Sequence, residues 1–406
     1  SAYFVPVIMI IAVVSAMVWL NFGPHPAIAY ALVTATTVLI IACPCALGLA
    51  TPMSVMVGIG KSAEAGVLIR NGEALQTASQ ITAMVLDKTG TITLGAPKVT
   101  DIVAAEGFTE ATILQFAATL ESGSEHPLAM AIMENAREQG IKPGKTHNVK
   151  SSNFKAIVGQ GVQAEVDGKT VLFGNEKLMH SNSIDLGDFV EQAQQLAAEA
   201  KTPMYLSIDN QFAAIIAVAD PIKDDSIAAI KRLQHSGMRV IMLTGDNRAT
   251  AKAVADKVGI TEFFAEVLPE EKSAKVQELQ AQGEIVGMTG DGINDAPALA
   301  IANVGFAIGT GTDVAIESSD ITLMRGSLHG LADAIAISKA TLRNIKQNLF
   351  GAFVYNAAGV PIAAGVLFPV FGLLLNPVIA GAAMAFSSVT VVTNANRLRF
   401  FKAEEH

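Results

Sequence analysis

Val85-Leu86-Asp87-Lys88-Thr89-Gly90-Thr91 is the stretch from which the fold of this 406-residue chain can be worked out. The apolar run from Ile81 to Leu86 ends abruptly in a carboxylate, which Lys, Thr and Gly follow. A short apolar run bounded in this way is typical of a buried strand in a parallel sheet, and open α/β sheets bind ligands where such strands end. We therefore expect Asp87 at a binding edge, as a metal ligand, a helix cap or a nucleophile.

Two further apolar runs end in the same kind of turn. Arg239–Leu243 is followed by Thr244-Gly245-Asp246, and Ile285–Met288 is followed by Thr289-Gly290-Asp291-Gly292. Because parallel strands end at one edge of their sheet, the three acidic turns should converge there. Such a cluster of carboxylates repels itself unless a divalent cation and a basic group neutralise it.

The residues near these turns suit phosphoryl chemistry. Asp87 and Asp291, with Asp295 close behind, offer the few carboxylates that Mg²⁺ prefers alongside phosphate oxygens. Lys272 is expected to supply a fixed positive charge to a transferring phosphoryl group. The predicted hydrogen-bond donors to that group are Thr244 and Asn294.

The composition indicates that part of the chain lies in a membrane. Hydrophobic residues make up 51% of the chain and charged residues only 16%, and the mean hydropathy is +0.42, which is too apolar for an ordinary soluble protein. A net charge of −9 with no basic stripe argues against nucleic acid as a partner. The first apolar stretch has no basic region before it and does not resemble a signal peptide. We expect the chain to be part of a longer one.

Charge-free stretches predict four membrane spans. The first 60 residues contain no Asp, Glu, Lys or Arg and are broken at 21–26. Basic residues follow the second span, precede the third and follow the fourth, so the large middle part and both ends of the chain are expected in the cytoplasm. The predicted spans are about 2–20, about 27–53 and two more within 347–396, with a turn near 368–375.

The middle of the chain is expected to be a soluble α/β part with a second domain inserted into it. The inserted domain carries helix patterns at 110–119 and 127–139. It also contains Gly159-Gln160-Gly161, although a lone Gly-x-Gly is more often a turn than a nucleotide loop. Its strand-like segments lie at Val162–Val166, Thr170–Phe173 and Met204–Ile208.

Cys43-Pro44-Cys45 interrupts the second predicted span. In a regular helix, residues two apart point away from each other, so a structural disulfide is not expected and metal or redox chemistry is favoured. Pro44 removes a backbone hydrogen bond and unwinds that turn, which lets both thiols face the interior of the helix bundle. The alternative is a proline kink with two packed thiols.

The later spans add soft and polar donors. The third contains Tyr355-Asn356, and the fourth contains Met384 and Ser388, which share one helix face. Singly, such residues usually serve packing, but with two thiolates they form a soft donor set that selects Cu(I). Two thiolates leave one unit of negative charge around a monovalent ion, and no predicted span contains an acidic residue.

The acidic turns together resemble the signature set of P-type ATPases, whose phosphorylation domain is similar to haloacid dehalogenase hydrolases. The resemblance rests on Asp87-Lys88-Thr89-Gly90-Thr91, Thr244-Gly245-Asp246 and Gly290-Asp291-Gly292-Ile293-Asn294-Asp295-Ala296-Pro297. It implies that Asp87 attacks the γ-phosphate of ATP and becomes an aspartyl phosphate. The catalytic residues that it implies are Asp87, Lys88, Thr89, Thr244, Gly245, Asp246, Lys272 and Asn294, with Asp87, Asp291 and Asp295 around Mg²⁺.

Thr89 distinguishes a pump from a phosphatase. Hydrolases of this superfamily commonly carry a second Asp, a general acid, two positions after the nucleophile, where this chain has Thr89. Without that acid the aspartyl phosphate should persist, which suits an enzyme that must change shape before hydrolysis. The alternatives of other classes are a membrane-anchored phosphatase of the dehalogenase type, which Thr89 argues against, and a non-enzymatic copper sensor.

The inserted domain is similar to the nucleotide-binding domain of the heavy-metal branch of these pumps. The similarity rests on the Ser-Glu-His-Pro motif at 124–127 and on the glycines that follow it. Glycines let the backbone approach a planar base closely. The adenine-pocket residues that the resemblance implies are Glu121, Glu125, His126, Gly159, Gly161, Gly174 and Asn175.

The Cys-Pro-Cys, Tyr-Asn and Met-x-x-Ser-Ser motifs resemble the copper(I)-exporting branch. A Zn²⁺ or Cd²⁺ pump would be expected to carry an added carboxylate in its last span and a Lys in the span before, and neither is present here. Ag(I), which is equally soft, remains an alternative. The ligands implied for Cu(I) are Cys43, Cys45, Tyr355, Asn356, Met384 and Ser388.

The resemblance also implies how the whole pump is organised. An actuator domain, earlier spans and metal-binding domains are expected upstream of Ser1, and a soluble copper chaperone is the expected donor. The pump is expected to be a multi-pass protein of the plasma (inner) membrane with cytoplasmic catalytic domains. The expected parts are two spans at 1–60, the phosphorylation domain at 61–97 and 216–335, the nucleotide-binding domain at 98–215, and two spans with a tail at 336–406.

Overall fold

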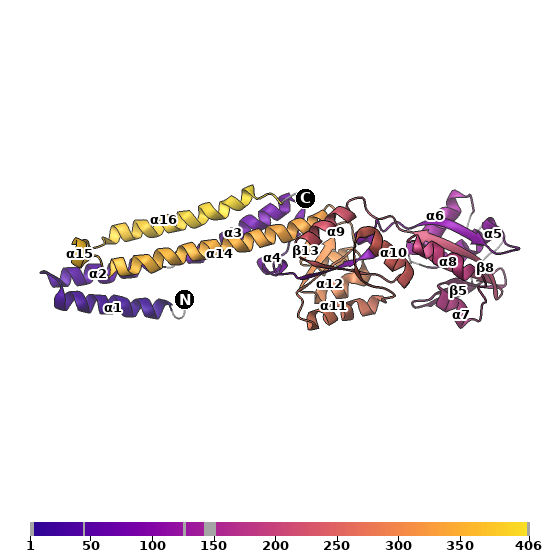
Figure 1. Ribbon diagram of the computed structural model, residues 1–406, viewed down its shortest axis with the longest axis horizontal. Coiled ribbons are helices and arrows are strands. Elements are labelled where there is room, and N and C mark those ends of the chain that lie inside the picture. The colour runs from indigo at the N-terminus through magenta and orange to yellow at the C-terminus, as the bar shows by residue number, and fades with distance from the viewer. Residues whose placement is uncertain (1–3, 44, 125–126, 142–151, 404–406) are drawn as a thin grey trace. The chain divides into compact units, whose positions relative to one another are not determined.

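The computed structural model describes residues 4–43, 45–124, 127–141 and 152–403, and the chain forms two compact units (Figure 1). The helical unit comprises Ser1–Ala65, Asn71–Ser79 and Asp333–His406. The α/β unit comprises Gly66–Arg70 and Gln80–Ala332.

Long helices make up the helical unit. Packing pairs α1 with α2, and α16 with both α2 and α3, so segments from the two ends of the sequence share one apolar core. The prolines at 24 and 26 follow the end of α1, as the predicted break requires. The helices of this unit are α1 (Phe4–Phe22), α2 (Ala27–Ile41), α3 (Cys45–Glu64), α4 (Gly72–Ala78), α14 (His329–Ala363, which starts in the α/β unit), α15 (Phe368–Phe371) and α16 (Pro377–Asn396).

Among the described residues, three helical stretches are long and apolar enough to cross a membrane: Phe4–Phe22, Ala27–Glu64 and Pro377–Phe400. They correspond to the first, second and fourth predicted spans. The third predicted span is the C-terminal part of α14, which is not among them. Its charge-free part begins only at Gln347, and Asn348, Tyr355 and Asn356 lower its hydropathy.

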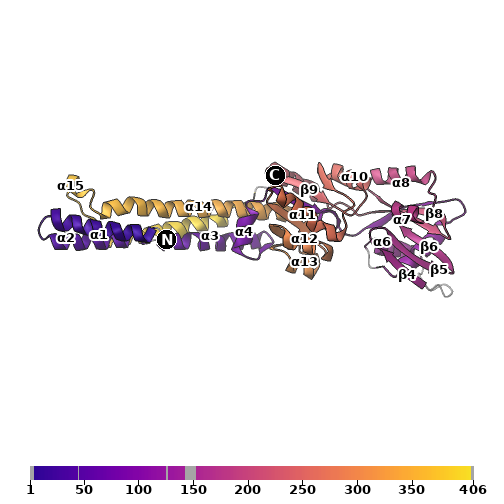
Figure 2. The ribbon, with the colours of Figure 1, turned by 90° about the horizontal axis from the view of Figure 1, so that it is seen from below.

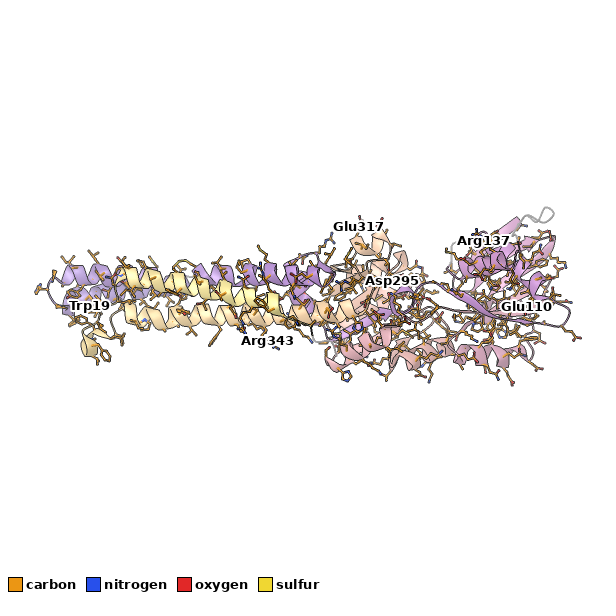
Figure 3. All side chains as sticks on the ribbon, turned by 90° about the horizontal axis from the view of Figure 1, so that it is seen from above. Trp19, Glu110, Arg137, Asp295, Glu317 and Arg343 are labelled. Carbon is orange, nitrogen blue, oxygen red and sulfur yellow. A yellow bond between two sulfur atoms is a disulfide. The ribbon has the colours of Figure 1, made fainter. Side chains whose placement is uncertain are left out.

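An aromatic cluster joins the ends of three helices in the helical unit. The Trp19 ring stacks on Tyr30 with ring centroids 5.6 Å apart, and Phe368 meets it edge-on at 4.9 Å. The Trp19 indole N–H donates to the Ala364 carbonyl at 3.0 Å. Figure 3 places Trp19 beside the chain turn at this end of the helices. Aromatic rings with a polar handle are typical of membrane interfaces.

A buried amide network links α3, α14 and α16. Asn348 donates to Ser54 Oγ and to Asn344 Oδ1, both at 3.0 Å, and accepts from Asn394 Nδ2 at 2.9 Å. Ser54 in turn donates to Asn344 Oδ1 at 2.9 Å. Polar side chains of this kind hold membrane helices together because lipid offers them no partner.

The larger sheet of the α/β unit follows the predicted pattern. β2, β11 and β12 are buried along their whole length, which explains why their sequences are continuously apolar. All neighbouring strands are parallel except the pair β1 and β13. The strand order is β1 (Val67–Ile69), β13 (Ile321–Leu323), β12 (Val304–Ile308), β11 (Val286–Gly290), β2 (Ala83–Asp87), β9 (Arg239–Leu243) and β10 (Glu262–Phe264).

Helices cover both faces of this sheet (Figures 1 and 2). Val276 and Leu279 of α11 and Leu299 of α12 pack with Val85 and Met288 on one face. α9 packs against β9, and α10 against β10. These helices are α9 (Ser226–His235), α10 (Arg248–Val258), α11 (Lys272–Ala281), α12 (Ala296–Ile301) and α13 (Asp313–Glu317).

The inserted part is built on a six-stranded antiparallel sheet, and it contains the three strand segments and the two helices that the sequence predicted. Its strands alternate in the direction of their side chains: Val171 and Phe173 pack under α5 and α6, whereas Leu172 packs on the side of α7 and α8. The strand order is β3 (Lys98–Ala104), β8 (Gln211–Ala219), β7 (Thr202–Ile208), β6 (Lys169–Gly174), β5 (Gly161–Val166) and β4 (Ser152–Ile157), and the helices are α5 (Glu110–Glu121), α6 (Pro127–Glu138), α7 (Glu176–Ser181) and α8 (Phe189–Ala198). The predicted mixture of membrane helices, a parallel-sheet domain and an inserted α+β domain is confirmed.

Candidate phosphorylation site and cysteine pair

The acidic turns meet at one edge of the larger sheet. Asp87 is the last residue of β2, and Asp291 follows β11 directly, with Asp295 in the next turn. β2 and β11 are neighbouring parallel strands, so the fold itself brings the carboxylates together. Oxygen atoms of Asp87, Asp291 and Asp295 lie within 4.8 Å of one another.

Lys272, the first residue of α11, joins two of these carboxylates. Its Nζ donates to Asp87 Oδ1 at 2.6 Å and to Asp295 Oδ1 at 2.7 Å. All three side chains are buried, and buried charges require such partners. The ammonium group that the sequence predicted for this site is therefore hydrogen-bonded to Asp87, the predicted nucleophile.

Burial sets the proton affinities of the cluster. Burial and the neighbouring Asp295 raise the pKa of Asp87 to about 7, although Lys272 pulls it down. Burial and Asp295 likewise raise the pKa of Asp291 to about 6. Burial lowers the pKa of Lys272, but the two carboxylates outweigh that effect and the net shift is upward. The three carboxylates therefore carry more negative charge than Lys272 alone can balance.

The donor set fits Mg²⁺. Hard divalent cations take carboxylate oxygens, and the surplus negative charge favours a cation. Asp87 offers Oδ2, which accepts one hydrogen bond from the Thr89 N–H at 3.1 Å. Both oxygens of Asp295 are engaged, Oδ1 by Lys272 and Oδ2 by the N–H groups of Asp291 and Gly292. Asp295 thus orients the turn, while Asp87 and Asp291 are better placed to hold the metal.

Gly90 is required where the turn after Asp87 (residues 88–96, the Asp87 turn) passes Asp291. Its φ is +72°, and a Cβ there would lie 1.7 Å from Asp291 Oδ2. Only glycine allows both the left-handed conformation and the close approach.

Lys88 and Asp246 pair with each other. Lys88 Nζ donates to Asp246 Oδ2 at 2.5 Å, and the Asp246 N–H donates to Thr244 Oγ1 at 3.1 Å. The ion pair connects the turn after β2 with the turn after β9. In the second of these turns, Gly245 lies between Thr244 and Asp246. Asn294 is exposed in the turn that precedes Asp295.

A charged segment that the sequence did not predict lies against the Asp87 turn. Asp220 accepts from the Thr93 hydroxyl at 2.5 Å and from the Ala96 N–H at 3.1 Å. Lys223 donates to the Gly90 carbonyl at 2.7 Å. The sequence feature that could have predicted this segment is an acidic run after the apolar β8, Asp220-Pro221-Ile222-Lys223-Asp224-Asp225.

In the inserted domain, Glu121 is 5% exposed, and its Oε2 has no hydrogen-bond partner among the described residues. Burial raises its pKa to about 7, although a hydrogen bond with Ser124 pulls it down. Glu125 and His126 lie outside the described residues. A buried carboxylate oxygen without a hydrogen-bond partner is costly unless a ligand supplies one.

The predicted glycines of this domain pack at close range. Gly159 and Gly161 have φ of +69° and +145°, and a Cβ on Gly174 would lie 2.2 Å from the Gln160 carbonyl oxygen. Asn175 accepts from the Leu178 N–H at 3.1 Å and donates to the Gly159 carbonyl at 2.8 Å. Asn175 thus caps α7 and holds the glycine turn.

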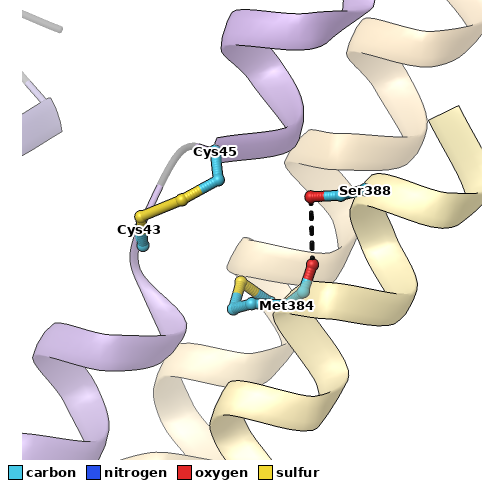
Figure 4. The surroundings of a disulfide bond; sticks show 4 residues. All are labelled: Cys43, Cys45, Met384 and Ser388. Atoms are coloured by element: carbon cyan, nitrogen blue, oxygen red, sulfur yellow. Dashed lines mark hydrogen bonds between the residues drawn. A yellow bond between two sulfur atoms is a disulfide. The ribbon is translucent and has the colours of Figure 1, made fainter. Parts of the chain in front are cut away.

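The cysteine pair differs from the prediction. Cys43 and Cys45 form a disulfide (Figure 4), so the expectation that they would not be bonded was wrong. α2 ends at Ile41 and α3 begins at Cys45, so the regular helix that would point the two side chains apart is interrupted. Their Cα atoms lie 5.5 Å apart, within the range that a disulfide spans.

The structure brings some of the predicted copper ligands together. In Figure 4 the side chain of Met384 lies on the side of α16 that faces the cysteines, and the Ser388 hydroxyl donates to the Met384 carbonyl at 3.3 Å. Met384 packs with Ala42, the residue before Cys43. Asn356 is buried, whereas Tyr355 is 41% exposed and lines a cavity of about 200 Å³ with Ser387 and Thr390.

Comparisons with known proteins identify the family. The profile of the haloacid dehalogenase-like hydrolases matches residues 81–303. The chain is 52% identical over 98% of its length to copper-transporting ATPase 2 of Rhizobium meliloti (strain 1021), covering 48% of that protein. It is 51% identical over 98% of its length to the silver-exporting P-type ATPase of Salmonella typhimurium, of which it also covers 48%. The chain thus spans about half the length of these relatives.

Solved structures agree with this assignment. A zinc-transporting PIB-type ATPase in its E2.Pi state matches 98% of the chain and 62% of its own length, with a TM-score of 0.73 and 33% identity. A catalytic domain of a CPx-ATPase matches 69% of the chain and 98% of its own length, with a TM-score of 0.54 and 26% identity. The chain therefore belongs to the haloacid dehalogenase-like hydrolase family, and over 98% of its length it is similar to P-type ATPases.

Proposed function

We propose that the chain carries the phosphorylation, nucleotide-binding and ion-binding parts of an ATP-driven Cu(I) exporter of the plasma membrane. The observation that carries the proposal is the contact of Lys272 with Asp87 beside Asp291. Relatives that the chain matches over 98% of its length are named copper-transporting and silver-exporting ATPases.

Asp87 is the proposed nucleophile. One of its carboxylate oxygens forms a bond to the γ-phosphorus of ATP, the bond from that phosphorus to the β–γ bridging oxygen breaks, and ADP leaves with the electron pair. Lys272 balances the charge of Asp87 before the reaction and of the phosphoryl group afterwards. Mg²⁺, held by Asp87 and Asp291, would supply positive charge to the phosphate oxygens.

Thr89 supports a pump rather than a phosphatase. Its N–H donates to Asp87 Oδ2, but its side chain offers no carboxyl group to protonate a leaving group or activate water. A phosphorylated Asp87 would therefore survive long enough for a conformational change. A phosphatase would instead hydrolyse small phosphate esters rapidly without a trapped intermediate.

ATP is proposed to bind to the inserted domain. The buried Glu121 and the close-packed glycine turns at 159–161 and 174 support this assignment, together with the likeness to a CPx-ATPase catalytic domain. Glu125 and His126, although outside the described residues, are proposed to take part.

Reduced Cys43 and Cys45 are proposed to bind Cu(I) with Met384. Two thiolates and a thioether are soft ligands, and the charge-free helices 4–60 and 347–396 offer a monovalent ion no carboxylate. The disulfide carries no thiolate, so ion binding requires its reduction. Tyr355, Asn356 and Ser388 are proposed as polar neighbours of the site. Ag(I) is the second candidate because a relative exports silver.

The organisation of the whole pump is part of the proposal. The catalytic domains lie in the cytoplasm, a soluble chaperone delivers the copper, and an N-terminal half with an actuator domain completes the cycle. The relatives' greater length supports a further half.

Trapping of the intermediate tests the proposed chemistry. The chain should take label from γ-labelled ATP in an acid-stable, hydroxylamine-labile form, and Asp87→Asn should abolish the label. Asp256→Asn, which changes an exposed carboxylate on α10, is the matched control and should label normally. Label that survives in Asp87→Asn would identify a different nucleophile.

A further inference from the structure

The segment Asp220–Ser226 forms hydrogen bonds with the Asp87 turn along its length. Thr93 and Ala96 donate to Asp220, as described above, and Leu94 N–H donates to the Pro221 carbonyl at 2.9 Å. Further along, the Ser226 hydroxyl donates to the Ile92 carbonyl at 2.7 Å. The turn that follows Asp87 therefore cannot move without disturbing this segment.

Lys223 connects that turn to a second place in the chain. Its Nζ donates to the Gly90 carbonyl at 2.7 Å and to the Gly326 carbonyl at 3.0 Å. Gly326 lies between β13 and the first residue of α14. Burial lowers the pKa of Lys223, and Asp225, Asp291 and Asp220 oppose that shift, so the ammonium group is held among carboxylates.

A second set of hydrogen bonds connects the segment Asp220–Ser226 with the start of α14. The Ser327 hydroxyl donates to Asp225, two residues after Lys223, and the His329 N–H donates to Ser327 Oγ at 3.1 Å. Ser327 therefore satisfies one of the free N–H groups at the start of α14. From His329 the helix runs without a break to Ala363 and contains Asn356.

We infer that Lys223 is a positioning residue that transmits the state of the Asp87 turn to the start of α14. A phosphoryl group on Asp87 adds negative charge and new hydrogen-bond acceptors beside the turn, so the Gly90 carbonyl shifts or Lys223 is drawn toward the new charge. Either change alters the contact of Lys223 with Gly326, because one ammonium group serves both carbonyls. The inference rests on the proposed phosphorylation of Asp87.

Hydrogen exchange with a phosphate mimic tests the inference. The full chain is measured with and without Mg²⁺ and beryllium fluoride, which occupies the place of a phosphoryl group on a carboxylate. Exchange is followed at residues 88–96, which report occupancy of the site, and at residues 326–332, which report the start of α14. The unaltered chain should respond at both segments.

The variants separate transmission from binding. Lys223→Met should keep the response at 88–96, because Asp87 and Lys272 are unchanged, and should lose it at 326–332. Lys223→Arg, which keeps the donor, should restore that response. Lys231→Met, on the exposed face of α9, is the matched control and should respond at both segments. Ser327→Ala should weaken the response at 326–332 without changing Lys223.

The remaining outcomes overturn the inference in different ways. If Lys223→Met responds at 326–332 as the unaltered chain does, the signal does not pass through Lys223. If it responds at neither segment, Lys223 serves the site itself and transmits nothing. If the unaltered chain gives no response at 88–96, the proposed phosphorylation of Asp87 fails, and the inference fails with it.

Discussion

Lys272 Nζ lies 2.6 Å from Oδ1 of Asp87, and the same ammonium group lies 2.7 Å from Oδ1 of Asp295. One buried cation thus holds two of three clustered carboxylates, which leaves negative charge for a metal ion to balance. Because Asp295 also holds the ammonium group, Lys272 can stay beside Asp87 when the charge on Asp87 changes during a reaction.

Lys272→Met should reduce phosphorylation of Asp87 by about 100-fold or more, the effect typical of removing a charge-stabilising group from an active site. Without Lys272, Asp87 loses the group that pulls its pKa down, so more of it is protonated and unable to attack. Acid-stable label from γ-labelled ATP at neutral pH gives the measurement. Lys275→Met, on the same helix but partly exposed, should label normally, and equal loss in both variants would contradict the assigned role.

Gly90→Ala should lose most of the phosphorylation. The new Cβ would meet Asp291 Oδ2 at 1.7 Å, so the Asp291 carboxylate must move. A non-glycine residue in this left-handed conformation also costs about 1 kcal/mol. Gly168→Ala has nearly the same φ, +73°, but open space around its Cβ, so it isolates the conformational cost. Similar activities in the two variants would mean that the contact with Asp291 is unimportant.

Glu121→Gln should make the stability of the inserted domain less dependent on pH. Burial raises the native pKa of Glu121 from 4.5 to about 7, so its contribution is fully present below pH 4.5 and is lost as pH rises through about 7. Above pH 7 the variant should be more stable than the unaltered chain by at most about 3 kcal/mol, and near pH 4 the two should agree.

The opening free energy of the α5 amides, from hydrogen exchange corrected for intrinsic rates, measures this effect. Glu110→Gln, at the exposed start of the same helix (Figure 3), is the control and should follow the unaltered chain at every pH. Parallel curves for Glu121→Gln and the unaltered chain would show that Glu121 is ionised in the native state.

Reduction of the Cys43–Cys45 disulfide should be needed for Cu(I) binding, because only thiolates are strong ligands. Competition with a Cu(I) chelator under anaerobic conditions should show binding by the reduced chain and none by the oxidised chain. Cys43→Ser should abolish it and Met384→Leu should weaken it, whereas Met56→Leu, an exposed methionine on α3, should have no effect. Equal affinity of the oxidised chain would place the ion elsewhere.

Asn348→Leu should destabilise the helical unit by about 1–2 kcal/mol, as lost interhelical hydrogen bonds do in membranes. The change leaves Ser54 and Asn394 without the partner that each now has in Asn348. Unfolding in mixed micelles measures the effect, and Gln347→Leu, on the exposed side of α14, is the control. A stability equal to that of the control would show that water or lipid headgroups replace the network.

The parallel sheet explains how much the sequence could tell. Asp87 and Asp291 each end an apolar run, and parallel strands end at one edge, so their meeting was predictable without coordinates. Lys272 was predictable from the charge that those carboxylates require. Lys223 was not, because its partners are the backbone carbonyls of Gly90 and Gly326, and any residue type carries a carbonyl.

The membrane helices show the opposite case. The charge-free stretches located three spans. The C-terminal part of α14 falls short of the hydropathy of a span because of polar residues, and one of them, Asn348, builds the buried amide network that joins the helices. The cysteine pair was misjudged because the break at Pro44 was expected to turn both thiols toward a metal ion, whereas the break, with α2 ending at Ile41, brings the two sulfur atoms within bonding distance of each other. Periodicity describes regular elements and fails where they break.

Trp19 is the only tryptophan of the chain, and it is packed between Tyr30 and Phe368 with its indole N–H bonded to Ala364. Tryptophan fluorescence therefore reports on that one end of the helical unit, because the α/β unit contains no tryptophan. Emission wavelength and quenching of the unlabelled chain would follow rearrangement of α1, α2 and the turn at α15 during the catalytic cycle without any added dye.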